Sequence, residues 1–185
     1  MGIVVSKNGG ASWTSIKICN QTGSQSTVAA IAPNNANILY VGGVNSDWKA
    51  LIYKGTNGGA NWTAITNGIL NQPQAIAVDP QDSNIAYIAT YDAVWRSSNG
   101  GDAWTKCAFA SNAWGFKALA VNKNNPNQVF VGCGGGVFYS QDRGLTWTDV
   151  TEGLSVPDVT QLYFNSANST LYVGTEGSGL WKRTF

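Results

Sequence analysis

Carboxylates are the side chains of this sequence best suited to acid–base chemistry, because its 185 residues include no histidine. The absence of histidine excludes the common serine-hydrolase triad and most proton transfer near neutral pH. Two carboxylates can instead hydrolyse a glycosidic bond when they flank a bound sugar, one as acid and the other as base or nucleophile. The candidates are three aspartates between predicted strands: Asp47, Asp92 and Asp158.

Aromatic residues accompany these carboxylates. Trp48 follows Asp47, Tyr91 precedes Asp92, and Trp114 lies in a later loop. An exposed aromatic ring covers the apolar face of a sugar, while a carboxylate accepts hydrogen bonds from its hydroxyls. We therefore predict that these five residues bind a ligand, with a polysaccharide or oligosaccharide as partner. The alternative is that the aromatic rings close the ends of the hydrophobic core.

A repeat supplies the elements that must position these residues. Four segments share one pattern, SKNGGASW, GTNGGANW, SSNGGDAW and SQDRGLTW, and start 49, 42 and 43 residues apart. This spacing is typical of propeller blades. In each segment glycine permits a tight turn, Asn or Asp accepts hydrogen bonds from the turn amides, and Trp packs between blades. The residues with these structural roles are Asn8, Trp13, Asn57, Trp62, Asn99, Trp104, Asp142 and Trp147.

The sequence around each turn predicts a four-stranded antiparallel blade. Two apolar segments separated by a polar turn precede a third strand, and the repeated turn leads into a fourth. Apolar residues show no helical period. We predict an all-β propeller of about four blades, in one domain covering residues 1–185. Three arrangements stay open: closure of SWTSIKI onto GLWKRTF in one chain, completion by a second copy through the terminal strands, or a fragment of a larger propeller.

The turn pattern S-x-D-x-G-x-[TS]-W, present as SQDRGLTW, resembles the Asp-box of the BNR-repeat proteins. These include sialidases, xyloglucanase-like glycosidases, sortilin-type receptors and photosystem assembly factors. The resemblance implies a propeller and favours an extracellular or periplasmic location. Sialidase activity does not fit, because that site needs three converging arginines and the three present here are dispersed. They are Arg96, Arg143 and Arg183.

Xyloglucanase-like enzymes place their cleft between two propellers, and this sequence accounts for at most one. We therefore predict a non-catalytic Asp-box propeller that acts as a binding or scaffold module, with glycans as candidate ligands. One alternative is a fragment of a xyloglucanase-like glycoside hydrolase. A purely structural repeat protein is the other.

Composition narrows the partners further. Eleven basic and ten acidic residues give a net charge of +1, whereas nucleic acids and anionic membranes attract a concentrated basic face. Three separated cysteines, Cys19, Cys107 and Cys133, do not form a zinc-ligand pattern. We predict no nucleic-acid or membrane partner, no metal and no cofactor.

Overall fold

The computed structural model describes residues 1–109, 113–155 and 158–185, and all regular structure in these ranges is β. Strands adjacent in sequence pair antiparallel, so each sheet is a meander. The predicted all-β propeller architecture is confirmed. No helix within the described ranges has the length and apolar character needed to cross a membrane.

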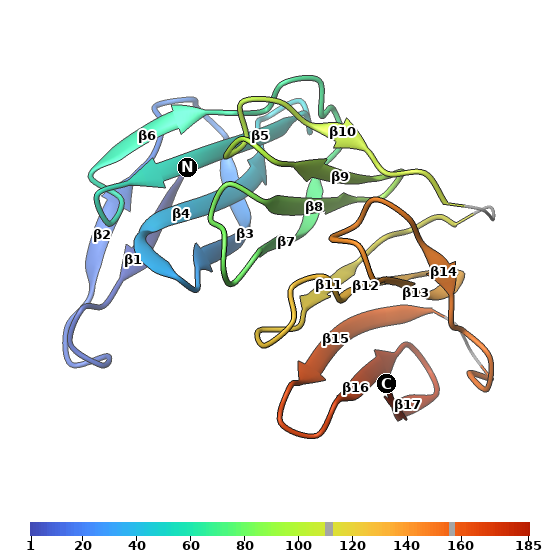
Figure 1. Ribbon diagram of the computed structural model, residues 1–185. Helices are drawn as coiled ribbons and strands as arrows, with labels where there is room; N and C mark the ends of the chain where they lie inside the picture. Colours follow the sequence, from blue (N-terminus) through green and yellow to red (C-terminus); the bar gives the residue numbers. More distant parts are fainter. Residues whose placement is uncertain (110–112, 156–157) are drawn as a thin grey trace.

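The sheets follow one another around an open arc (Figure 1). The N-terminal hairpin consists of β1 (Gly2–Val5) and β2 (Thr14–Lys17). The first blade contains β3 (Gln25–Ala32), β4 (Asn35–Val44), β5 (Ala50–Thr56) and β6 (Asn61–Ala64). The second contains β7 (Pro73–Val78), β8 (Ala86–Thr90), β9 (Val94–Ser97) and β10 (Thr105–Lys106). The third contains β11 (Ala118–Val121), β12 (Val129–Cys133), β13 (Gly136–Ser140) and β14 (Thr148–Asp149), and the fourth contains β15 (Val159–Asn165), β16 (Thr170–Thr175) and β17 (Gly179–Thr184).

The second and third blades pack on their neighbours through both faces of their sheets, because successive side chains of a strand point to opposite faces. Ile88 of β8 lies in a cluster with Ile52 of the first blade. The adjacent Tyr87 lies in a separate cluster with Phe138 of the third blade. The core of this protein is therefore a series of layers between blades.

Closure within one chain, one of the three predicted arrangements, is not formed. Among the described residues, β2 pairs with β1 and β17 pairs with β16, and the two terminal sheets do not pair with each other. The physical reason is that β1 already occupies the edge of β2 that closure would require. The arc is consistent with the third arrangement, a partial propeller.

The repeated turns are held by a serine and the residue two positions after it. In the first, third and fourth turns the serine hydroxyl accepts a hydrogen bond at 2.8 Å from the glycine amide four residues on. Asn8, Asn99 and Asp142 each accept the amide four residues later, at 2.9, 2.9 and 2.8 Å. These are local bonds that need no ligand, which agrees with a structural role.

The second turn departs from this arrangement. Gly55 stands where the other turns have serine, and Asn57 adopts a φ of 53°. Within the described part of the chain, the side chain of Asn57 does not accept a turn amide. The predicted acceptor role of Asn57 is therefore wrong, because without the serine hydroxyl the segment forms an ordinary hairpin turn in which Thr56 pairs with Asn61.

The tryptophans after the turns differ in burial. Trp147 is 8% exposed, and Trp104 donates its indole N–H to the carbonyl of Ile65 in the preceding blade at 2.8 Å. Trp62 covers Gly55, where an added Cβ would lie 2.8 Å from the indole. Trp13 is 64% exposed, so its predicted packing between blades is wrong. Trp104 and Trp147 pack on the preceding sheet, and no sheet of the described chain precedes the N-terminal hairpin.

Candidate functional site

The turns between second and third strands lie with the blade-to-blade connections on one face, which we call the loop face. Backbone hydrogen bonds tie each turn to a neighbouring connection. Ala50 donates to Leu70 at 3.0 Å, and Glu176 donates to Asp158 at 2.9 Å. The repeated turns instead contact the turns between first and second strands, as in the bond from Gly100 to Asn84 at 2.8 Å. The predicted ligand-binding residues thus stand on a face that the repeated turns do not share.

Tyr91 and Trp114 form an exposed aromatic pair on the loop face. Their ring centroids are 6.1 Å apart with planes inclined by 54°, and the side chains are 57% and 53% exposed. Gly115 donates its amide to the Tyr91 carbonyl at 2.8 Å, and Gly134 donates to the Trp114 carbonyl at 3.0 Å. The Trp114 indole also lies on the backbone of Gly134, where a Cβ would approach it to 2.9 Å. Three segments therefore hold this pair in place while leaving it open to solvent.

Asp92 follows Tyr91 in the turn between β8 and β9. Its carboxylate accepts a hydrogen bond from the Thr90 hydroxyl at 2.9 Å. Partial burial acts to raise the pKa of Asp92, but hydrogen bonds from Asn71 and Thr90 outweigh it and the pKa is lowered. Asp92 is therefore ionised near neutral pH and suits the role of base or hydroxyl acceptor.

Asp158 belongs to a separate charged group. The Lys117 ammonium lies 2.8 Å from one Asp158 oxygen and 3.6 Å from a Glu176 oxygen. The hydrogen bond to Asp158 is the main cause that raises the pKa of Lys117. Asp158 thus serves first as the partner of a cation. Sequence reasoning missed Lys117, because no sequence pattern links it to Asp158, 41 positions later.

Asp47 and Trp48 occupy the turn between β4 and β5. The Asn45 side chain organises this turn by accepting the amides of Asp47 and Lys49, each at 3.0 Å. Trp48 is 68% exposed and adopts a φ of 61°, which is unusual for a bulky residue and costs energy. The turn therefore presents the indole to solvent in a strained conformation.

The predicted site residues fall into three groups. Tyr91, Trp114 and the adjacent Asp92 are together, Asp158 is with Lys117, and Asp47 and Trp48 stand on their own turn. Leu70, 74% exposed in the connection bonded to the Trp48 turn, is an apolar residue of this face that sequence reasoning did not single out. In the described ranges no three Asp, Glu or Cys side chains gather as metal ligands would.

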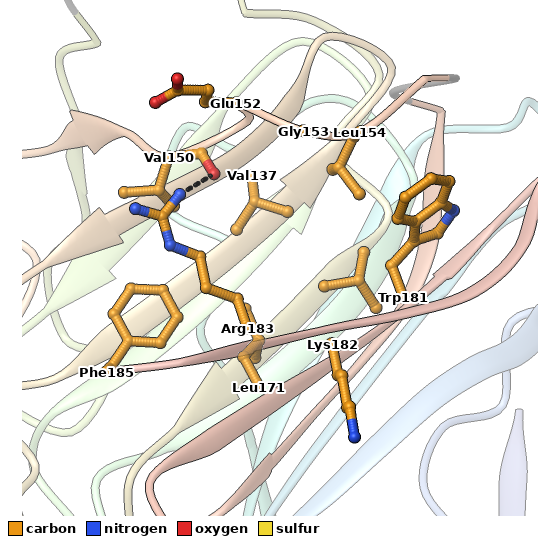
Figure 2. A pocket seen from close by; sticks show the side chains of 11 residues that line it. Val137, Val150, Glu152, Gly153, Leu154, Leu171, Trp181, Lys182, Arg183 and Phe185 are labelled. Carbon is orange, nitrogen blue, oxygen red and sulfur yellow. Dashed lines mark hydrogen bonds between the residues drawn. The ribbon is translucent and has the colours of Figure 1, made fainter.

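A cavity of about 330 Å³ lies elsewhere, between the third and fourth blades. Figure 2 shows Trp181 at this cavity and Arg183 donating to the Val150 carbonyl, a bond of 3.0 Å. The corresponding carbonyl of the first blade, that of Ile65, accepts the Trp104 indole. The cavity therefore marks a contact between blades, and we do not assign the ligand site to it.

Comparisons with known proteins agree with this architecture. No protein-family model matches the chain. A Paenibacillus protein named xyloglucanase is 28% identical over 134 residues, which are 62% of this chain and 13% of that relative. A xyloglucanase of Hypocrea jecorina is 26% identical over 194 residues, covering 85% of this chain and 22% of the relative. The chain thus spans less than a quarter of the length of these relatives.

Solved structures give the same relationship. The crystal structure of an ancestral GH74 enzyme matches with a TM-score of 0.74 and 26% identity, over 90% of this chain and 24% of that one. The structure of YCF48 bound to D1 peptide matches with a TM-score of 0.61 and 14% identity, over 91% of this chain and 57% of that one. At this identity the match is evidence for the fold alone.

These relatives correct the leading functional prediction. A non-catalytic binding or scaffold module was expected, because the chain accounts for at most one propeller. The similarity to proteins named xyloglucanase and to a GH74 enzyme contradicts that prediction and favours the alternative of a glycoside hydrolase fragment. The chain is a β-propeller that is similar to glycosidases in sequence and structure.

Proposed function

We propose that this chain forms part of a glycoside hydrolase of the xyloglucanase type, and that its loop face binds the polysaccharide. The repeated turns are then Asp-boxes, and residues 1–185 form one partial propeller domain. The observation that carries the proposal is the exposed Tyr91–Trp114 pair beside the ionised Asp92, in a chain similar to proteins named xyloglucanase. An extracellular location fits a polymeric substrate and belongs to the same proposal.

Aromatic residues are assigned the main binding role. Tyr91 and Trp114 provide one stacking platform and Trp48 a second, and both are rigidly supported and open to solvent. Asp92 and Asp47 accept hydrogen bonds from the sugar hydroxyls. The strained Trp48 backbone supports this role, since such strain is found preferentially at functional sites.

The carboxylates are assigned by their surroundings. The lowered pKa of Asp92 suits a base and does not suit an acid that must stay protonated. Asp158 is bonded to Lys117 and keeps the connection before β15 in position. Asp47, on an exposed turn, is the remaining aspartate of this face, and we assign it as the second carboxylate of the pair.

Binding tests the first half of the proposal. Titration with a xyloglucan oligosaccharide is expected to show weaker binding by Trp114→Ala, by about 1 to 3 kcal/mol on the scale of ring stacking on aromatic residues. Trp13→Ala is the matched control, because Trp13 is similarly exposed but lies beside a repeated turn. Trp48→Ala against Trp62→Ala adds a second comparison: the first is expected to reduce affinity and the second thermal stability. If the wild-type chain fails to bind, or binds equally well without Trp114 and Trp48, the proposal is wrong.

Hydrolysis tests the second half. Release of reducing sugar from xyloglucan is measured for the wild type and for Asp92→Asn, Asp47→Asn and Asp158→Asn, with binding measured in parallel. Loss of release with retained binding in Asp92→Asn and Asp47→Asn supports the assigned roles. Full release by both variants would remove these aspartates from the reaction.

A further inference from the structure

A buried hydroxyl contacts the turn that carries Tyr91 and Asp92. Thr90 is the last residue of β8 and is fully buried. Its Oγ1 lies 2.9 Å from Oδ1 of Asp92 and 3.0 Å from the backbone carbonyl oxygen of Ala93. A threonine hydroxyl has one proton, so it donates to one of these two oxygens at a time. The choice of acceptor decides what Thr90 does in this turn.

The carbonyl of Ala93 has a donor already. It accepts the amide of Thr90 at 2.8 Å, a bond that closes the turn between β8 and β9. The Asp92 carboxylate is ionised near neutral pH, and an ionised acceptor forms a stronger hydrogen bond than a neutral one. The proton of the Thr90 hydroxyl is therefore directed to Oδ1 of Asp92.

The strand pairing of a blade does not require this hydroxyl. The third blade has Cys133 at the position of Thr90, and Cys133 pairs with Gly136 in the same way. The fourth blade has Thr175, whose hydroxyl donates to the carbonyl of Gly179 at 3.0 Å and, in the described part of the chain, does not reach a carboxylate. Of the four blades, only the second has a hydroxyl at this position and a carboxylate two residues later. The contact with Asp92 is thus a feature of one turn and not of the repeat.

The surroundings of Thr90 offer no substitute for its hydroxyl. Because the side chain is fully buried, water does not reach the position of Oγ1. The residue paired with Thr90 on β7 is Pro73, and proline has no amide hydrogen to donate. Removal of the hydroxyl therefore leaves Oδ1 of Asp92 without a donor on this side.

The other groups that act on Asp92 are less firmly placed. Partial burial acts to raise the pKa of Asp92, whereas hydrogen bonds from Asn71 and Thr90 and the positive charge of Lys106 lower it. Asn71 belongs to the connection between the first and second blades, and Lys106 belongs to β10. Both of these side chains are exposed, whereas Thr90 is fully buried. Thr90 is therefore the contact with a fixed geometry.

We propose that Thr90 is the positioning residue of Asp92, and that its hydroxyl holds Oδ1 so that Oδ2 is the oxygen presented to the substrate. This inference rests on the proposed glycoside hydrolase function. When Asp92 acts as base, Oδ2 takes a proton from a water whose oxygen bonds to the sugar carbon. The glycosidic bond breaks in the same step, and its oxygen receives a proton from the second carboxylate.

Titration of Asp92 tests the contact independently of any reaction. Its pKa is measured from the carboxyl carbon shift by NMR in the 185-residue chain. Thr90→Val, which removes the hydroxyl, should raise the pKa of Asp92, whereas Thr90→Ser should keep the wild-type value. Thr175→Val is the matched control, because it removes the equivalent hydroxyl from a turn in which it contacts no carboxylate of the described chain. Equal pKa values of Asp92 in the wild type and Thr90→Val would overturn the proposal.

Circular dichroism establishes that each variant is folded. If Thr90→Val does not fold, Thr90→Cys takes its place, because the third blade forms with Cys133 at the equivalent position. The thiol is a much weaker donor than the hydroxyl, so the same rise in the pKa of Asp92 is expected.

The pH dependence of sugar release from xyloglucan tests the role in the reaction. Thr90→Val should lower kcat at least about 10-fold with little change in KM, since a positioned base contributes about 100-fold or more. The acidic limb of its pH profile should move to higher pH, because Asp92 must be ionised to act. Thr90→Ser should restore both. A Thr90→Val variant with the wild-type kcat and pH profile overturns the proposal. A wild type that releases no sugar overturns the proposed hydrolysis instead, and the titration then decides whether Thr90 holds Asp92.

Discussion

Replacement of Arg143 by glycine tests how the fourth repeated turn is fixed to the second blade. Arg143 has a φ of 57° at a position where the other three turns have glycine. Its Nε lies 3.2 Å from an oxygen of Asp79, a fully buried carboxylate. The backbone carbonyl that binds Tyr87 and Arg96 is kept in the glycine variant. Arg143→Gly therefore removes the side chain alone.

Two opposing effects set the magnitude. Loss of one partner from a buried ion pair typically costs about 3 to 5 kcal/mol. Release of a non-glycine residue from the left-handed region returns about 1 to 2 kcal/mol. Arg143 is 34% exposed, and its Nε contact is close enough for charge attraction without the direction of a hydrogen bond. Both facts favour the lower part of the range, so Arg143→Gly should lower the free energy of unfolding by about 2 kcal/mol.

Urea denaturation followed by tryptophan fluorescence measures this change, and Asp79→Asn provides the control. Asparagine keeps the oxygen that accepts the Gln81 and Asp82 amides, at 2.8 and 3.0 Å, and removes only the charge. In the Asp79→Asn background, Arg143→Gly should have no effect or stabilise the fold slightly. If Arg143→Gly stabilises the wild type, or costs as much without the Asp79 charge, the ion pair does not fix this turn.

Three further predictions concern the repeated turns and the cysteines. Ser97→Ala should lower the free energy of unfolding by about 1 to 3 kcal/mol, because it leaves the buried Gly101 amide unpaired. Ser6→Ala, in the exposed first turn, should lower it by less than about 0.5 kcal/mol. Urea denaturation of both variants measures the difference. Although burial opposes the effect, hydrogen bonds from Thr146 and Ser140 lower the pKa of Asp142 to about 2. Its stabilising contribution is therefore present above the ordinary pKa of 3.8 and lost as the pH falls toward 2, so Asp142→Asn should make the melting temperature less dependent on pH in that window. Burial raises the pKa of Cys107 to about 11, whereas at Cys19 hydrogen bonds from Gln21 and Ser24 outweigh burial and lower the pKa. Iodoacetamide should therefore modify Cys19 before Cys107. Equal modification rates of the two thiols, measured by mass spectrometry, would contradict this prediction.

Much of the fold could be predicted because its information is local. In the first, third and fourth repeated turns, the serine and the residue two positions on lie within a few residues of the amides they bind. The spacing of the turns and the apolar strands between them indicated blades. The second turn shows the limit, since replacement of serine by Gly55 was visible in the sequence but its effect on Asn57 was not anticipated.

The sequence predicted which face of the propeller carries the candidate site, but not how the residues of that face contact one another. Turn order placed Tyr91, Trp114 and Asp92 at the same end of their strands, but their contact depends on Gly134 of the next blade, which supports the Trp114 indole. The bond between Lys117 and Asp158 joins residues 41 positions apart and has no sequence pattern of its own. Such contacts depend on how blades are placed relative to one another.

The sequence by itself determined the repeat, the strand order within a blade and the turns that join the strands, because each follows from hydrogen bonds and side-chain alternation within a few tens of residues. Only the tertiary structure decided which blade faces are covered. Tyr87 and Tyr172 have equivalent neighbours in sequence, yet one is fully buried and the other half-buried. Burial of a blade face depends on the sheet that packs against it, and a single repeat does not encode whether that neighbour is present.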